Sequence, residues 1–161
     1  MTRRREKHLA YHRLLEALGT ARSCPLCELE AHDVHRYLEG LLYESVNDVA
    51  VRAELVRSRG YCARHAHQLA AFADGLGTAI LYGDQVRVFL EFLGGSGELL
   101  GGRRRLAQST WNDPARCPAC AFQWECRKGY VATLLAWLTD EPLRAALAQS
   151  PGLCAPHLLA A

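Results

Sequence analysis

Apolar residues recur at intervals of three and four along most of the chain, a spacing that predicts amphipathic helices. The clearest stripe predicts a helix that ends near Ser45; its apolar positions are Leu26, Leu29, Tyr37, Leu38, Leu41 and Leu42. Asn47 or Asp48 can then cap a second helix that runs to about Ser58, and Gly60 provides its stop. A long helix, a turn and a shorter helix are therefore expected here.

Similar reasoning predicts helices on either side of this pair. A leading helix is expected from about Arg3 to Leu18, closed by Gly19, and another from about Thr78 to Leu93. A short helix is expected to begin at the Cys-x-x-His element, residues 62–65. Ala and Leu dominate the composition while Val, Ile and Thr are scarce, which favours helix over sheet. The predicted fold class is all-α.

The second half of the chain repeats the first. Cys24-Pro25-Leu26-Cys27 aligns with Cys117-Pro118-Ala119-Cys120 at an offset of 93 residues, and Cys62-Ala63-Arg64-His65 aligns with Cys154-Ala155-Pro156-His157 at 92. Between these anchors the matching positions include Tyr37 with Tyr130, Leu41 with Leu134, Asp48 with Asp140, Arg52 with Arg144, and Gly60 with Gly152. The pattern indicates an internal duplication of helical hairpins. Each Asp–Arg pair, four residues apart, is expected to form a local ion pair on its helix.

Glycines mark the expected division of the chain. Residues 94–102 are Gly-rich and predict a flexible linker, which would separate a leading helix plus first unit, residues 1–93, from a second unit, residues 103–161.

Composition limits the functions that this chain can have. A net charge of +2 over 161 residues creates no global field that would recruit nucleic acid or anionic membrane. The N-terminus is basic but lacks the apolar run of a signal peptide or membrane span, so a cytoplasmic location is expected, without membrane partners. In a reducing compartment, seven cysteines suggest metal binding or catalysis more than disulfides.

The cysteine spacing points to metal. Cys-Pro-x-Cys places its proline where the first helical turn tolerates it, so both thiols lie at a helix N-terminus, which favours the thiolate form that binds zinc. Cys-x-x-His places a thiol and an imidazole on one face of a helical turn. Three thiolates and one imidazole complete a tetrahedral shell with no open position for water, as in structural zinc sites.

The two halves of each site must come together in space. If each long helix is followed by a shorter one that returns to its start, each repeat closes its own Cys3His site. The first site would then contain Cys24, Cys27, Cys62 and His65, and the second Cys117, Cys120, Cys154 and His157. Two zinc ions are expected, with an iron–sulfur cluster as the alternative.

The paired blocks carry a family resemblance. Residues 24–29, the stretch Leu42–Asp48 and the Gly60-Tyr61-Cys62-x-x-His65 element resemble a bacterial family of unknown function whose members carry C-P-x-C and G-x-C-x-x-H blocks. The resemblance covers both repeats and implies ligand roles for the eight matched Cys and His residues. It implies no activity.

Other reactive residues leave alternatives open. Cys126 could be a spare ligand, a reactive thiol or a small core residue, and His67 could compete with His65 as a ligand. The pairs His8 with His12 and His32 with His35 could clamp a second metal, although surface or packing roles are favoured. Arginine clusters at Arg3 to Arg5 and Arg103 to Arg105 could bind nucleic acid.

No hydrolase elbow, zinc-protease motif or convincing pair of carboxylates is present, so catalysis is not expected. The sequence predicts a zinc-stabilised helical scaffold that binds a protein, nucleic acid or small ligand through the surface between its halves. An iron–sulfur or thiol redox protein and a nucleic-acid-binding protein are the alternatives.

Overall fold

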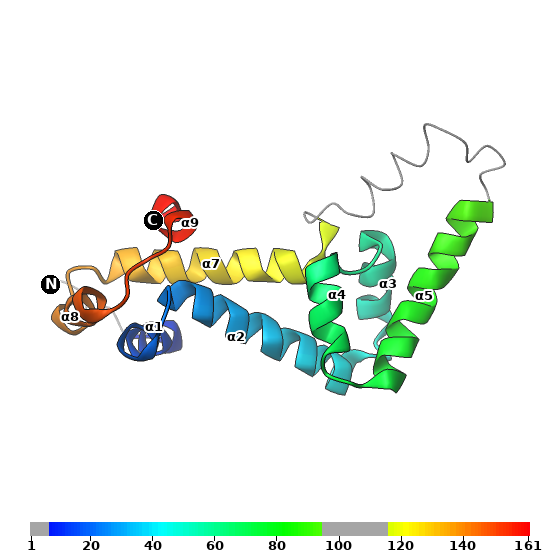
Figure 1. Ribbon diagram of the computed structural model, residues 1–161, viewed down its shortest axis with the longest axis horizontal. Helices are drawn as coiled ribbons and strands as arrows, with labels where there is room; N and C mark the ends of the chain where they lie inside the picture. Colours follow the sequence, from blue (N-terminus) through cyan, green and yellow to red (C-terminus); the bar gives the residue numbers. More distant parts are fainter. Residues whose placement is uncertain (1–6, 95–115) are drawn as a thin grey trace, which may run out of the picture. The chain divides into compact units, whose positions relative to one another are not determined.

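The computed structural model describes residues 7–94 and 116–161, and this part of the chain is helical without strands (Figure 1). The all-α prediction is confirmed. The elements in chain order are α1 (Leu9–Thr20), α2 (Pro25–Gly40), the π-helical η1 (Leu41–Ser45), α3 (Val49–Ser58), α4 (Ala63–Ala70), α5 (Gly75–Gly94), α7 (Pro118–Ala136), α8 (Glu141–Gln149) and α9 (Ala155–Ala160). No helix in the described ranges is both long and apolar enough to cross a membrane.

The chain divides into two compact units, and each unit combines segments from both repeats. Unit 1 consists of Met1–Asp33 and Gln123–Ala161, and unit 2 of Val34–Phe122. Helices α2 and α7 therefore each begin in one unit and end in the other. The predicted linker at residues 94–102 lies, apart from the backbone of Gly94, outside the described residues.

The core of unit 1 joins α1 to the second repeat. Leu14 and Leu18 of α1 pack in one buried cluster with Leu134 of α7 and Leu143 of α8. Both Leu14 and Leu143 are completely buried. The leading helix, which lies outside the repeats, is therefore an integral part of this unit.

Unit 2 is organised around the packing of α3 and α4 against α5. The guanidinium of Arg52 on α3 donates two hydrogen bonds to Asp84 on α5, from Nε at 2.7 Å and from Nη2 at 3.0 Å. The predicted local pair of Arg52 with Asp48 is thus wrong, because Asp48 instead caps α3 by accepting hydrogen bonds from the backbone N–H groups of Ala50 and Val51. An ion pair between α3 and α5 therefore takes the place of the predicted ion pair at the start of α3.

The boundaries of the first hairpin follow its local chemistry. The predicted helix does end at Ser45, but its last turn, residues 41–45, is π-helical. Helix α3 ends where Arg59 adopts the left-handed conformation with φ 57°, followed by Gly60 with φ 84°. Because glycine tolerates positive φ, Gly60 provides the predicted stop.

Candidate metal centres

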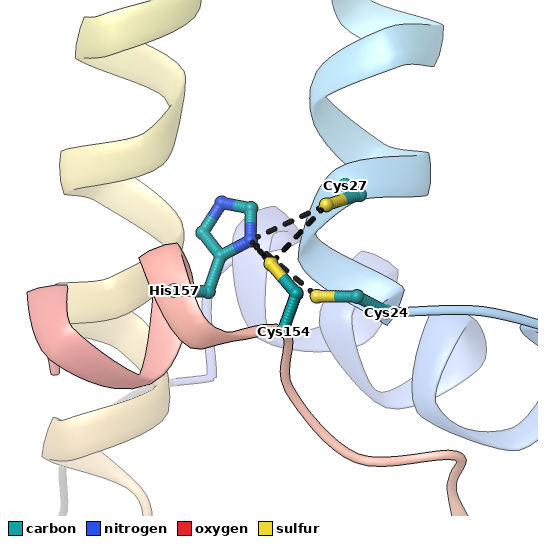
Figure 2. A group of neighbouring side chains, drawn as sticks. All are labelled: Cys24, Cys27, Cys154 and His157. Carbon is teal, nitrogen blue, oxygen red and sulfur yellow. Dashed lines mark hydrogen bonds between the residues drawn. The ribbon is translucent and has the colours of Figure 1, made fainter.

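Two groups of cysteine and histidine side chains could each hold a metal ion. Group one lies in unit 1 and contains Cys24 and Cys27 at the start of α2, together with Cys154 and His157 at the start of α9. Figure 2 shows the three sulfur atoms arranged around the Nδ1 atom of His157. The ligand atoms all lie within 4.8 Å of one another.

The distances within group one come close to those between ligands of a single tetrahedral ion. His157 Nδ1 lies 3.4 Å from the sulfur atoms of Cys24 and Cys27 and 3.1 Å from that of Cys154, and the sulfur atoms of Cys27 and Cys154 are 3.6 Å apart. Ligands bonded to one tetrahedral zinc at its usual bond lengths lie roughly 3.5–3.8 Å from each other. The side chains are therefore close to a coordinating arrangement.

Group two lies in unit 2 and has the same composition. It contains Cys62 and His65 at the start of α4, and Cys117 and Cys120 at the start of α7. His65 Nδ1 lies 3.4 Å from the sulfur atoms of Cys62 and Cys120 and 3.3 Å from that of Cys117, and the sulfur atoms of Cys62 and Cys120 are 3.7 Å apart. Its geometry matches that of group one.

All eight predicted ligands fall into these two groups, but the predicted pairing is wrong. Each C-P-x-C element meets the C-x-x-H element of the other repeat, whereas each repeat was expected to close its own site. The expectation required the shorter helix to return along the longer one. Helix α3, ten residues or about 15 Å long, instead packs against α5, so Cys62 stays in unit 2 while Cys24 lies in unit 1.

Local sequence explains how each ligand is presented. Cys62 and Cys154 are the N-cap residues of α4 and α9, and His65 and His157 follow one turn later, so thiol and imidazole face the same way. The backbone N–H of Glu28 donates to the Cys24 carbonyl, and that of Ala121 to the Cys117 carbonyl, so both C-P-x-C elements open regular helices. The histidines are both 1% exposed, which removes competition from bulk water.

A buried carboxylate supports the histidine of group one. Glu30 Oε1 lies 2.5 Å from His157 Nε2, on the side of the ring opposite the thiols. Arg127 donates to both oxygens of Glu30 at 2.9 and 3.0 Å, and Gln123 donates at 2.8 Å. Although burial raises the pKa of Glu30, these hydrogen bonds outweigh it and the pKa is lowered, so Glu30 is a carboxylate at neutral pH.

The histidine of group two has a different neighbour. Arg64 Nη2 lies 3.1 Å from His65 Nε2. Burial and the positive charge of Arg64 lower the pKa of His65 to about 4, so this ring is neutral at neutral pH.

Burial and neighbouring sulfur atoms oppose ionisation of one thiol in each group, Cys27 and Cys120. Burial raises the pKa of Cys24, but hydrogen bonds from the backbone and thiols of Cys154 and Cys27 outweigh it and lower the pKa to about 7. Burial and the neighbouring sulfur atoms raise the pKa of Cys27 to about 12. Burial and the neighbouring sulfur atoms likewise raise the pKa of Cys120, in group two, to about 12. A divalent ion would remove this repulsion, since it stabilises every thiolate that coordinates it.

The remaining reactive residues lie outside the two groups. Cys126 packs partly buried against the core of unit 1, as expected for a small hydrophobic residue, and burial raises its pKa. His67 contacts the Ala63 carbonyl through Nδ1, and the ring of His35 lies against that of Phe72 with the two planes tilted by 35°. Neither histidine pair belongs to a metal group within the described part of the chain. The clusters Arg3 to Arg5 and Arg103 to Arg105 lie outside the described residues.

Sequence reasoning missed Glu30. It lies six residues after Cys24, and its counterpart six residues after Cys117 is Gln123. The repeat alignment therefore pairs two polar residues that meet each other in the structure, at a place where the first helix would otherwise bury apolar side chains. A polar residue on a buried helical face is the signal that could have identified it.

Comparison with known proteins places the chain in a family. Residues 6–91, more than half of the chain, match the model of a family of unknown function, DUF6062. The chain belongs to this family. The match covers the first repeat and confirms the expected resemblance to a family without an assigned activity.

One relative is also without a known function. Over 66 residues the chain is 39% identical to an uncharacterized 23.9 kDa protein encoded in the xynA 3′ region of Caldicellulosiruptor sp. (strain Rt8B.4). The aligned part is 41% of this chain and 32% of that protein, so the chain matches about a third of the relative's length. No solved structure matches the chain significantly.

Proposed function

We propose that this member of the family is a non-catalytic helical scaffold in which groups one and two each hold one structural zinc ion. The observation that carries the proposal is the closed ligand set: three thiols and one imidazole per group, with all ligand atoms within 4.8 Å. Four protein ligands fill a tetrahedral shell, so no position remains where a bound water could be activated. The ion would then contribute to folding instead of chemistry.

The compactness of each group favours a single ion over an iron–sulfur cluster. In a cluster the ligands bind different iron atoms, so their sulfur atoms must stand further apart than those that share one ion. Cys27 and Cys154 are 3.6 Å apart, and Cys62 and Cys120 are 3.7 Å apart, which suits a shared ion. Zinc is the ion of first choice for a closed site of thiolates and imidazole.

A structural role follows from what each ion would join. In group one it would tie α2 of the first repeat to α9 of the second, and in group two α4 of the first to α7 of the second. Residues far apart in the chain are thereby linked, and structural zinc contributes on the order of 10 kcal/mol in small zinc domains. Each unit would depend on its ion for stability.

Metal counting tests this proposal. The full chain, purified without added metal, is expected to be colourless and to contain about two zinc ions per molecule by elemental analysis. Cys27→Ser and Cys120→Ser are each expected to reduce this to about one. Cys126→Ser is the matched control, because Cys126 lies outside both groups, and it should retain two. Visible charge-transfer absorption with stoichiometric iron and sulfide would contradict the assignment.

A chelator distinguishes structural zinc from incidental zinc. Stripping the metal is expected to lower the thermal unfolding temperature sharply and to reduce the helical circular dichroism, because the clustered thiols then lose their shared cation. Re-addition of zinc should restore both signals. A metal-free chain that keeps its unfolding temperature and helix content would rule out a structural role.

A further inference from the structure

The two metal groups share their ligands but differ in what touches the outer nitrogen of the histidine. In group one, Nε2 of His157 faces Glu30 at 2.5 Å, with both side chains at most 2% exposed. In group two, Nε2 of His65 faces Arg64 at 3.1 Å. A histidine that binds a metal through one ring nitrogen carries its proton on the other, so this contact affects the ability of the ring to serve as a ligand.

In group one the contact favours metal binding. A carboxylate accepts hydrogen bonds, so Glu30 holds the proton of His157 on Nε2 and leaves the lone pair of Nδ1 directed at the three thiols. Glu30 is itself fixed by two hydrogen bonds from Arg127 and one from Gln123. The ring is therefore set in both tautomer and orientation before an ion arrives.

In group two the contact opposes metal binding. A guanidinium has only donors, so Arg64 can meet Nε2 only when that nitrogen is the acceptor and the proton is on Nδ1. Yet Nδ1 is the atom that faces Cys62, Cys117 and Cys120. Binding an ion through Nδ1 would place an Nε2–H against another donor, so this contact with Arg64 must first be broken.

We propose that Glu30 is a positioning residue for His157, and that the two groups therefore bind zinc unequally, with group two as the exchangeable site. This inference rests on the proposed function, since it assumes that both groups hold zinc. It adds a division of roles: the ion of unit 1 is retained, whereas the ion of unit 2 can be lost and regained as the available zinc changes.

The order of release can be measured on the unaltered chain. Zinc-loaded protein with ¹⁵N-labelled histidine is titrated with a chelator, and the assigned ring nitrogens of His65 and His157 are followed by NMR. His65 is expected to lose its metal-bound signal first. In the loaded state His157 is expected to show a protected Nε2–H proton, because Glu30 accepts from it in a buried place.

Glu30→Gln tests the cause. Outer partners of metal-bound histidines typically change metal affinity by about 10–100-fold, so the dissociation constant of group one should rise by that factor while that of group two stays constant. Glu39→Gln is the matched control: Glu39 lies in the same helix, is exposed and belongs to neither metal group. It should leave both affinities unchanged.

Several results would overturn the inference. Simultaneous loss of the two ions, or release from His157 first, would contradict the unequal binding. If the zinc-loaded parent shows no protected Nε2–H proton on His157, the role of Glu30 is contradicted. This result holds even if the Glu30→Gln variant fails to fold. A parent chain that binds no zinc would contradict the proposed function itself, which is a different outcome from two ions held equally.

Discussion

Asp48 and Asp140 occupy equivalent positions in the two repeats but make different contacts. The carboxylate of Asp48 accepts from the N–H groups of Ala50 at 2.7 Å and Val51 at 3.0 Å, and so caps α3. Asp140 is also an N-cap residue, but its carboxylate accepts from the hydroxyl of Tyr11 at 2.5 Å and from Lys7 at 3.1 Å. An aspartate at the equivalent repeat position thus stabilises a helix end in unit 2 and the attachment of α1 in unit 1.

Asp48→Ala is expected to lower the free energy of unfolding by about 1 kcal/mol, because the first N–H groups of α3 lose their acceptor. Chemical denaturation of the zinc-loaded chain measures this difference. Asp48→Asn retains an acceptor oxygen and should cost only a few tenths of that amount. An equal loss in both variants would show that the cap contributes through its charge.

At the scale of the element, α1 shows that a helix outside the repeats can form part of the core of a unit that both repeats build. Its inner face supplies Tyr11, Leu14 and Leu18 to the buried core of unit 1. Its outer face carries Leu9, which is 75% exposed. The amphipathic pattern of this helix therefore matches its placement against α8.

Leu14→Ala is expected to destabilise the zinc-loaded chain by about 2–5 kcal/mol, the range for truncating a fully buried leucine. Leu9→Ala changes the same residue type on the exposed face of the same helix, and should remain within about 0.5 kcal/mol of the parent. Thermal or urea unfolding compares the two. Similar effects from both substitutions would contradict the docking of α1.

At the scale of the whole molecule, each metal group combines ligands from both repeats. Because each metal group takes its C-P-x-C element from one repeat and its C-x-x-H element from the other, neither repeat contains a complete group. A zinc ion in either group would therefore join the two halves of the sequence. Isolated residues 1–93 should not hold zinc with four protein ligands.

Double variants test directly whether each metal group takes its ligands from both repeats. Cys27→Ser with Cys154→Ser alters one group twice, so about one zinc ion per molecule should remain. Cys27→Ser with Cys62→Ser alters both groups, so neither ion should be retained. Elemental analysis separates these results, since closure of each site within its own repeat would reverse the two counts.

Much of the fold was predictable because helices depend on local patterns. The capping residue Asp48, the stop at Gly60 and the helix start at Cys62 each depend on neighbours within a few residues. The pairing of Arg52 with Asp84 was not predictable, because it depends on α5, which has no counterpart in the repeat alignment. Glu30 was missed because its partners, His157 and Arg127, are distant in the chain.

The sequence by itself determined the all-helical class, the duplication and the eight cysteine and histidine residues that gather in the structure, since these follow from periodicity and spacing. Only the tertiary structure decided which four residues share each group, because that depends on the direction α3 takes after the turn. Packing α3 on α5 keeps Cys62 in unit 2, where Cys117 and Cys120 lie. Spacing along a chain limits how far two residues can be apart, whereas packing determines which of them meet.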